Sequence, residues 1–283
     1  MDPFRHCETL TRDADKDRFL SALFAPADRR DALFALYAFN VEVARVGESV
    51  REPMAGEIRL QWWRDVLTGT ARGDVTANPV AAALLDTMAR CSLPPQDLLD
   101  LIDARSFDLY DDPMPSITAL EGYAKRTSSA LMALAARVLA GAHPALAPAA
   151  DAAGIAYALT GLLRVVARHA SQGQLFVPAD VLERHGARAE EALAGEATSA
   201  LRAALADVRS LARQHLAQFE ALQPFLPTAA GSAFLPLALV PGYLALMERR
   251  DYDPFRTPIE LPQWRRQWTL WRAARRFARV MKG

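Results

Sequence analysis

The chain repeats its apolar residues at the spacing of an α-helix along almost its whole length. Leu33, Leu36, Asn40 and Val43, for example, follow one another in steps of three and four, which places them on one helix face. No stretch alternates apolar and polar residues as a half-buried strand would. The stretches with a helical period are 28–46, 57–69, 78–92, 92–112, 116–141, 151–171, 197–222, 232–249 and 261–282. This periodicity predicts an all-α bundle of about ten helices.

Breaks within the longer runs can also be predicted. We expect residues 116–141 to bend at Gly122 or around residues 127–129, where small and β-branched residues gather. Pro236 and Pro241 fall inside another apolar run, so that run is expected to kink or break.

Composition limits the class of protein. The chain has 283 residues, 51% hydrophobic and 23% charged, and no shift in composition divides it, so we expect a single domain over residues 1–283. The 33 acidic and 33 basic residues cancel, so the overall charge does not favour nucleic acid as a partner. Cys7 and Cys91 are too few for a disulfide framework and lack the spacing of metal ligands, which suits a reducing compartment.

The sequence also bears on membranes. No window of eighteen or more residues reads as apolar enough to span a bilayer. The first residues, MDPFRHCETLTRDADKDRF, mix acids with bases and lack the apolar centre of a secretory signal. We therefore expect a cytoplasmic protein, at most peripheral on the inner face of the membrane.

Ionisable residues on the more apolar helices indicate candidate sites. Tyr37, Asn40 and Ala44 share a predicted helix face, with Glu48 one turn further on and Arg45 beside it. A side-chain group of this kind can bind a ligand inside a helical bundle. The alternative is a glutamate–arginine network that joins two helices.

A second candidate lies at the end of residues 151–171, which are almost wholly apolar and are expected to form a central buried helix. Arg164 and Arg168 are four residues apart and should share a helix face, with His169 beside them. The alternative is an interior ion pair between these arginines and acids such as Glu42 or Glu48. Like charge disfavours an imidazolium here, so we expect His169 to be neutral.

A third group, Asp108, Asp111 and Asp112, lies at a predicted helix end just before Pro113. Acidic residues before a proline are typical of a solvated turn, and this is the interpretation we favour.

Four stretches carry a more specific signal. They are LFAPADRRDALFALYAFN (23–40), IRLQWWRDVL (58–67), DLYDDPMPSITALEGYAKRTSSALMALAARVLAG (108–141) and AYALTGLLRVVARHASQGQLFVPADVL (156–182). Together they resemble the squalene/phytoene synthase family, the head-to-head prenyl transferases. The resemblance covers almost the whole chain and implies an isoprenoid-synthase-like bundle around an apolar central cavity.

The resemblance also implies where catalytic metal would bind. Active members carry two acidic motifs, each an Asp pair four residues apart, which hold the Mg²⁺ that neutralises two allylic diphosphates. This chain departs at both motifs, with Ala44 and Glu48 at the first and Val165 and His169 at the second. We therefore expect a non-catalytic protein without a cofactor. The alternative is a prenyl transferase making C30 or C40 isoprenoids, with Mg²⁺ held by Glu48 together with Asp108, Asp111 or Asp112.

The stretch FNVEVARVGESVREPMAGEIRLQWWRDVL resembles a non-synthase branch that includes the mitochondrial respiratory complex I assembly factor. That branch implies a role in building or maintaining a membrane complex, with respiratory-complex subunits as partners. Guanidinium groups in the cavity could still hold an anion without metal, such as a prenyl diphosphate or the phosphate of an anionic lipid. The candidates for this anion site are Tyr37, Arg45, Glu48, Arg164, Arg168 and His169.

Residues 261–283 predict a basic helix rich in tryptophan. Trp264, Trp268 and Trp271 fall within one arc at helical steps, and no acidic residue follows Glu260. The adjacent basic arc consists of Arg265, Arg272, Arg276 and Arg279. Indoles beside a basic face are typical of proteins at the surface of an anionic membrane, so we expect membrane contact here. The alternative is that the tryptophans pack on the core and the arginines are only solvated.

Overall fold

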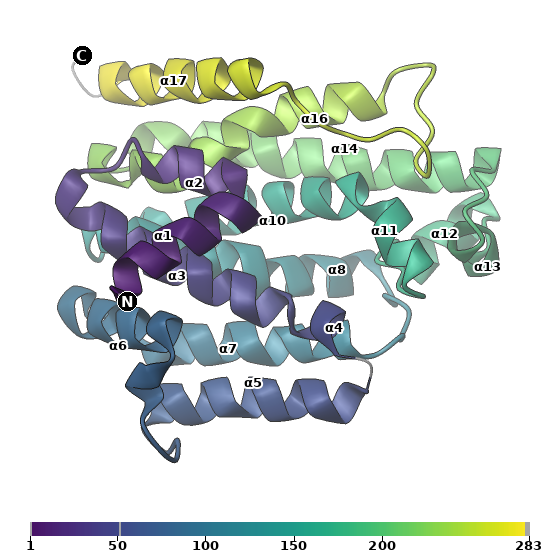
Figure 1. Cartoon of the computed structure of the whole chain (residues 1–283). Coiled ribbons are helices and arrows are strands. Elements are labelled where there is room, and N and C mark those ends of the chain that lie inside the picture. Colours follow the sequence, from purple (N-terminus) through teal and green to yellow (C-terminus); the bar gives the residue numbers. More distant parts are fainter. Residues whose placement is uncertain (1, 51, 281–283) are drawn as a thin grey trace.

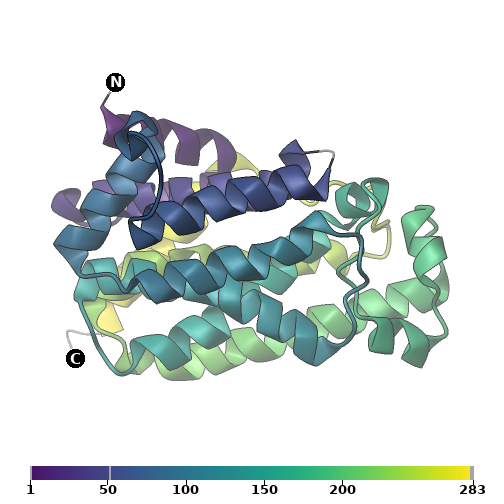
Figure 2. The same cartoon turned by 90° about the horizontal axis from the view of Figure 1, so that it is seen from below.

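The structure is a computed structural model that describes residues 2–50 and 52–280, and it contains no strand within those ranges. The all-α prediction is confirmed. Most of the long helices run along one common direction, with α17 and α5 at opposite edges and α10 between them (Figure 1). Figure 2 shows the same bundle from below, with α12 and α13 together at one end.

The helices follow one another in a simple order along the chain. They are α1 (Pro3–Ala14), α2 (Lys16–Ala22), α3 (Ala27–Ala44), α4 (Val46–Ser49), α5 (Pro53–Thr68), α6 (Pro79–Cys91), α7 (Pro95–Arg105), α8 (Ile117–Ala124), α9 (Ala130–Ala140), α10 (Leu146–Arg164), α11 (Val166–Ser171), α12 (Ala179–His185), α13 (Ala189–Leu193), α14 (Ser199–Leu222), α15 (Gly231–Phe234), α16 (Val240–Met247) and α17 (Gln263–Val280). Short 3₁₀ turns lie at Val75–Ala77, Ser106–Leu109, Gln223–Phe225, Thr228–Ala230 and Leu235–Leu239, and a π-helical segment at Lys125–Ser129.

The structure has more helices than the sequence predicts because several expected helices are divided. The π-helical segment Lys125–Ser129 separates α8 from α9, which confirms the bend expected around residues 127–129. The proline-containing run also breaks, because a 3₁₀ turn at Leu235–Leu239 separates α15 from α16. A third division was not expected: Val165 has φ −114° and ψ 17°, which is not helical and separates α10 from α11.

The buried core is continuous from Cys7 to Leu270. Helix α10 lies at its centre and packs against α8, α9, α14 and α16. Small residues allow this packing, since a Cβ on Gly154 would lie 2.2 Å from the Cα of Ser129. The prediction of a central buried helix over this stretch is confirmed.

The sequence was expected to contain no apolar segment long enough to span a membrane. By length and composition alone, that expectation is wrong. Leu146–Arg164 and Thr228–Met247 both reach the length and hydropathy of a membrane span. In the structure 61% and 72% of these windows are buried inside the fold. A core helix that is apolar on all sides has the same sequence pattern.

Candidate functional site

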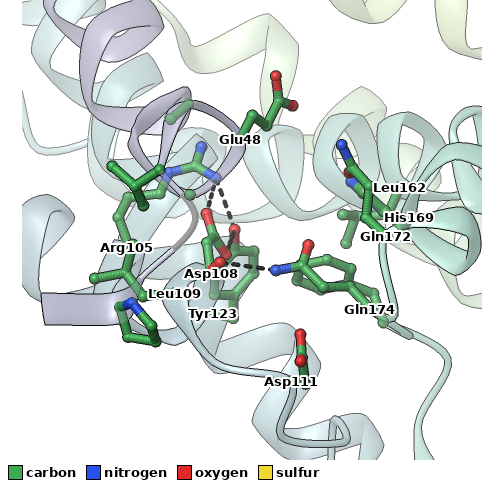
Figure 3. Close-up of a pocket in the computed structure, with 15 residues that line it drawn as sticks. Glu48, Arg105, Asp108, Leu109, Asp111, Tyr123, Leu162, His169, Gln172 and Gln174 are labelled. Atoms are coloured by element: carbon green, nitrogen blue, oxygen red, sulfur yellow. Dashed lines mark hydrogen bonds and ion pairs between the residues drawn. The ribbon is translucent and has the colours of Figure 1, made fainter. Parts of the chain in front are cut away.

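A pocket of about 500 Å³ opens where several helix ends meet (Figure 3). Its walls come from the ends of α3 and α7, from α4 and α8, and from α10 together with α11. Ala44, Glu48, Asp108 and His169 are among the residues that line it. Side chains from the three candidate groups of the sequence therefore face one pocket.

One wall of the pocket carries a closed network of polar side chains. The Nη1 of Arg105 donates to Oδ2 of Asp108 at 2.9 Å and to the hydroxyl of Tyr123 at 2.7 Å. That hydroxyl donates to Oδ1 of Asp108 at 2.7 Å (Figure 3). Burial raises the pKa of Asp108, and the Arg105 cation opposes the rise. The expectation of a solvated turn is wrong for Asp108, because both of its carboxylate oxygens accept part-buried hydrogen bonds, whereas Asp111 and Asp112 are exposed as expected.

A close backbone contact brings α4 against this network. A Cβ on Gly47 would lie only 2.6 Å from the carbonyl oxygen of Asp108, so a side chain at position 47 would force the two segments apart. The Nε2 of Gln174 donates to the same carbonyl at 2.7 Å. Glu48 is thereby held at the pocket, on a helix separate from the one that carries Tyr37.

Glu48 of α4, which lines the pocket, forms an ion pair with Arg168 of α11. Both side chains are partly exposed, 38% for Glu48 and 50% for Arg168. An arginine of the second group thus pairs with an acid of the first, as the alternative expected, but the pair is partly exposed rather than interior. The carboxylate of Glu48 is thus engaged by a cation of the protein itself.

His169 lies on the α11 side of the pocket, with its ring 4.7 Å from the ring of Phe176. Burial, and to a smaller extent the cations of Arg168 and Arg105, lower the pKa of His169 to about 4. This favours a neutral imidazole at neutral pH, as expected, with burial rather than like charge as the larger cause.

Arg164 does not share a face with Arg168, and that prediction is wrong because the helix breaks at Val165. Its Nη1 lies 3.6 Å from Oδ2 of Asp17 on α2, and its guanidinium lies 3.7 Å above the ring of Tyr243. The buried Asp17 also accepts a hydrogen bond from the Tyr243 hydroxyl at 2.8 Å and pairs with Arg266 of α17 at 3.0 Å. Arg164 is therefore part of a buried junction of α2, α10, α16 and α17.

Two other anion-site candidates also lie away from the pocket. Tyr37 is buried in the core, where its ring faces the guanidinium of Arg18 at 5.9 Å, and burial raises its pKa. Arg45 lines a separate groove of about 370 Å³ together with Arg59 and Trp62. Of the six candidates, Glu48, Arg168 and His169 are brought together, and Tyr37, Arg45 and Arg164 are not.

The apolar space beside the pocket is small. Leu162, His169 and Phe176 form the boundary between the pocket and an apolar hollow that also includes Leu159 and Val208. The free volume of this hollow is about 10 Å³. That is roughly the space of one water molecule, so no prenyl tail fits there without movement of the surrounding side chains.

The residues around the pocket do not fit Mg²⁺. Such a hard cation needs free carboxylate oxygens, but Glu48 is paired with Arg168, and Asp108 with Arg105 and Tyr123. Asp111 is the remaining acidic side chain of the lining. Across the described residues, no group of three or more His, Cys, Asp or Glu is placed to hold a metal ion. The lining therefore offers too few free oxygens for a magnesium cage.

The side chains expected to contact a membrane lie on α17 at one edge of the fold (Figure 1). Trp264 and Trp268 are 69% and 53% exposed, so these two indoles do not pack on the core. Trp271 is half-buried and stacks on Trp268, with ring centroids 4.9 Å apart. Arg265, Arg272 and Arg276 are exposed, whereas the side chain of Arg279 lies outside the described part of the chain.

Sequence reasoning missed Arg105, Tyr123 and Asp17. Arg105 directly precedes the acidic cluster, and Tyr123 lies within a family-like stretch, so both could have been considered. Asp17 belongs to an N-terminal stretch of mixed charge that gives no local sign of burial. Its two arginine partners are far away along the chain, and only the fold brings them together.

The family model for squalene/phytoene synthase matches residues 11–272. The complex I assembly factor 6 of Rattus norvegicus is 33% identical over 259 residues, covering 92% of this chain and 78% of that protein. A phytoene synthase of Arthrospira platensis is 27% identical over 287 residues, covering 95% of this chain and 91% of that protein.

A solved structure, the squalene synthase HpnC from Alicyclobacillus acidocaldarius, superimposes with a TM-score of 0.76 at 25% identity. The superposition covers 89% of this chain and 95% of that one. The isoprenoid-synthase-like architecture expected from the sequence is therefore confirmed. With a family match over most of its length, this chain belongs to the squalene/phytoene synthase family.

Proposed function

We propose that this chain is a non-catalytic member of its family that helps to assemble or maintain a respiratory membrane complex. The observation that carries the proposal is the ion pair between Glu48 and Arg168. The family resemblance implies four positions at which active members carry aspartates. In this chain, Glu48 is the one acidic residue at those positions. In this chain that acid faces a guanidinium instead of a metal ion.

The neighbouring residues support the same proposal. His169 is neutral at neutral pH and Ala44 has no ligand atom, so neither adds a charged oxygen to the pocket. Ionisation of an allylic diphosphate needs concentrated positive charge on the leaving group, which metal ions usually supply. The small apolar hollow beside the pocket also argues against a long prenyl substrate.

The relatives give the proposal its biological setting. The mammalian proteins at 31–33% identity are named complex I assembly factor 6. We infer from this likeness that subunits of a respiratory complex are the partners of this chain, and that it works at the inner face of the membrane that holds that complex. A prenyl diphosphate or lipid phosphate would be a bound ligand of the pocket rather than a substrate.

Deleting the gene in the organism that carries it tests the proposal. We expect less assembled NADH dehydrogenase on native gels, with normal levels restored by the wild-type chain and by Glu48→Gln. The glutamine variant removes the charge but keeps the shape, so a scaffold tolerates it and a metal-dependent enzyme does not. Full assembly in the deletion strain would contradict the proposal.

The second candidate function is prenyl transfer, favoured by the likeness to phytoene synthases. It would need Glu48 to leave Arg168 and Asp108 to give up Arg105, with Asp112 joining Asp111 from outside the pocket lining. Incubating the purified chain with farnesyl or geranylgeranyl diphosphate and Mg²⁺, then extracting hydrocarbons, decides between the two. We expect no C30 or C40 product, and its formation would establish the enzyme.

A further inference from the structure

Helix α17 divides its side chains among three arcs. The arc toward the core holds Arg266, Leu270 and Phe277, which are buried or half-buried. At 100° per residue, Trp264, Trp268, Trp271 and Arg275 fall on an outward arc. Arg265, Arg272 and Arg276 lie on the arc beside it. The aromatic and basic arcs are therefore neighbours on this helix, which runs along one edge of the fold (Figure 1).

The charge of this surface has one sign. No acidic residue occurs between Leu261 and Gly283, although the whole chain has a formal charge of +0. Among the described side chains of α17, Arg266 alone forms an ion pair, and its partner is the buried Asp17. The exposed Arg265, Arg272, Arg275 and Arg276 thus have no acidic partner in the part of the chain that the structure describes, which fits an anionic partner.

The tryptophans indicate which kind of anionic partner fits. Trp268 and Trp271 stack on each other at an interplanar angle of 22°, and the guanidinium of Arg275 lies 4.1 Å from the Trp271 ring centre. Trp271 therefore has two stacking partners within the protein and Trp268 has one, which leaves less aromatic surface for nucleic-acid bases to stack on. Exposed indoles beside arginines on a convex helix instead match the headgroup region of a bilayer.

A groove runs along the basic arc. It has a volume of about 330 Å³ and lies between α17 and the segments α14 and Leu235–Leu239. Arg272 and Arg276 line it, together with apolar residues that include Phe219 and Leu237 and with the single acid Glu220. Guanidinium groups beside an apolar groove suit a molecule with a phosphate and a hydrocarbon chain.

We propose that the outward face of α17 docks on the surface of a membrane that contains anionic phospholipid. Trp264 and Trp268 enter the headgroup region, Arg265, Arg272 and Arg276 pair with lipid phosphates, and the groove beside them takes apolar parts of a lipid. The inference deepens the proposed function and rests on it for its biological setting. It names the surface that would bring the chain to a membrane complex.

Co-sedimentation of the full-length chain with vesicles tests the proposal. We expect binding to vesicles of phosphatidylcholine with phosphatidylglycerol, and little binding to phosphatidylcholine alone. The triple variant Arg265→Gln, Arg272→Gln, Arg276→Gln should lower the partition coefficient about a hundredfold, because each arginine near an anionic surface adds roughly a factor of five. Trp264→Ser with Trp268→Ser should weaken binding on the same vesicles, at unchanged charge.

Matched variants elsewhere on the chain serve as controls. Arg5→Gln, Arg72→Gln and Arg126→Gln remove three exposed arginines from other elements, and Met54→Ser with Ile58→Ser removes two apolar side chains that are 71% and 64% exposed on α5. We expect all variants to keep the wild-type unfolding temperature and the controls to keep vesicle binding.

Three results would overturn the inference: equal binding by the α17 variants, an equal loss in the controls, or stronger binding to single-stranded DNA than to anionic vesicles. A chain that binds no vesicles but still restores complex assembly would refute this inference and leave the proposed function intact.

Discussion

Glu48 on α4 and Arg168 on α11 form an ion pair beside the pocket that Glu48 lines. The two residues come from opposite walls that belong to distant parts of the sequence. The family resemblance implies that metal ions join these two walls in active relatives. Here a direct contact between side chains joins them, so the local charge is balanced without a cofactor.

The strength of this pair can be measured by a double-mutant cycle with Glu48→Gln and Arg168→Gln. Because both side chains are more than one-third exposed, we expect a coupling energy of less than about 1 kcal/mol. High salt should reduce it further, since exposed charges are screened. Urea unfolding of the four proteins gives the coupling, and a value above about 2 kcal/mol would show that the pair is desolvated in solution.

Stability should depend on pH through His169. Its pKa is lowered to about 4 in the folded chain and is near 6.5 when exposed. Between these values the unfolded chain binds a proton that the folded chain does not, so the free energy of unfolding falls as the pH falls from about 6.5 to about 4. The histidine should account for a loss of about 2 kcal/mol between pH 7.5 and pH 4.5.

Comparison with His169→Gln isolates this effect from other groups that titrate. The variant should lose less stability than the wild type over the same pH interval, as measured by urea unfolding. The chain has five histidines, so NMR can follow each imidazole directly. Parallel pH profiles for the two proteins, or a measured pKa near 6.5, would refute a buried neutral His169.

Local patterns in the sequence were enough to predict the helices and several of their breaks. The π-helical segment Lys125–Ser129 includes residues 127–129, and Pro236 lies within the 3₁₀ turn that breaks the proline-containing run. The interruption at Val165 was not predictable, because an apolar, helix-like run continues through it. That one interruption turns Arg164 and Arg168 toward different partners, so the predicted shared face failed.

The candidate site was predictable only in part, because some of its contacts join helices that are distant along the sequence. Spacing along a helix placed Ala44 and Glu48 on a functional surface, and the structure puts both at the pocket. The network around Asp108 depends on Arg105 and Tyr123, which come from separate helices. Which distant helices meet is set by tertiary packing, and no single-sequence period encodes it.

The junction at Asp17 should be important for the position of α17. Asp17→Asn removes the negative charge between Arg164 and Arg266 and leaves a buried guanidinium without its partner. We expect a loss of about 3–5 kcal/mol in the free energy of unfolding. Hydrogen exchange should also become faster in α17 than in α10, because Arg266 holds α17 to the core.

Asp251→Asn is the matched control for that variant. Asp251 also pairs with an arginine, Arg249, but both side chains are well exposed, at 70% and 61%. We expect no change in stability or in exchange. Similar effects from the two substitutions would show that the junction around Asp17 has no special role.

Two glycines of α10 should respond in opposite ways to the same substitution. A Cβ on Gly154 would lie 2.2 Å from the Cα and 2.3 Å from the backbone nitrogen of Ser129, so Gly154→Ala must push α10 away from the π-helical segment. We expect it to cost about 3 kcal/mol or more, because backbone atoms cannot move aside as a flexible side chain can. No atom lies within 4 Å of a Cβ on Gly161, so Gly161→Ala should gain about 0.5–1 kcal/mol from helix propensity alone. Thermal unfolding of both variants checks the pair, and a destabilising Gly161→Ala or a neutral Gly154→Ala would contradict this packing of α10.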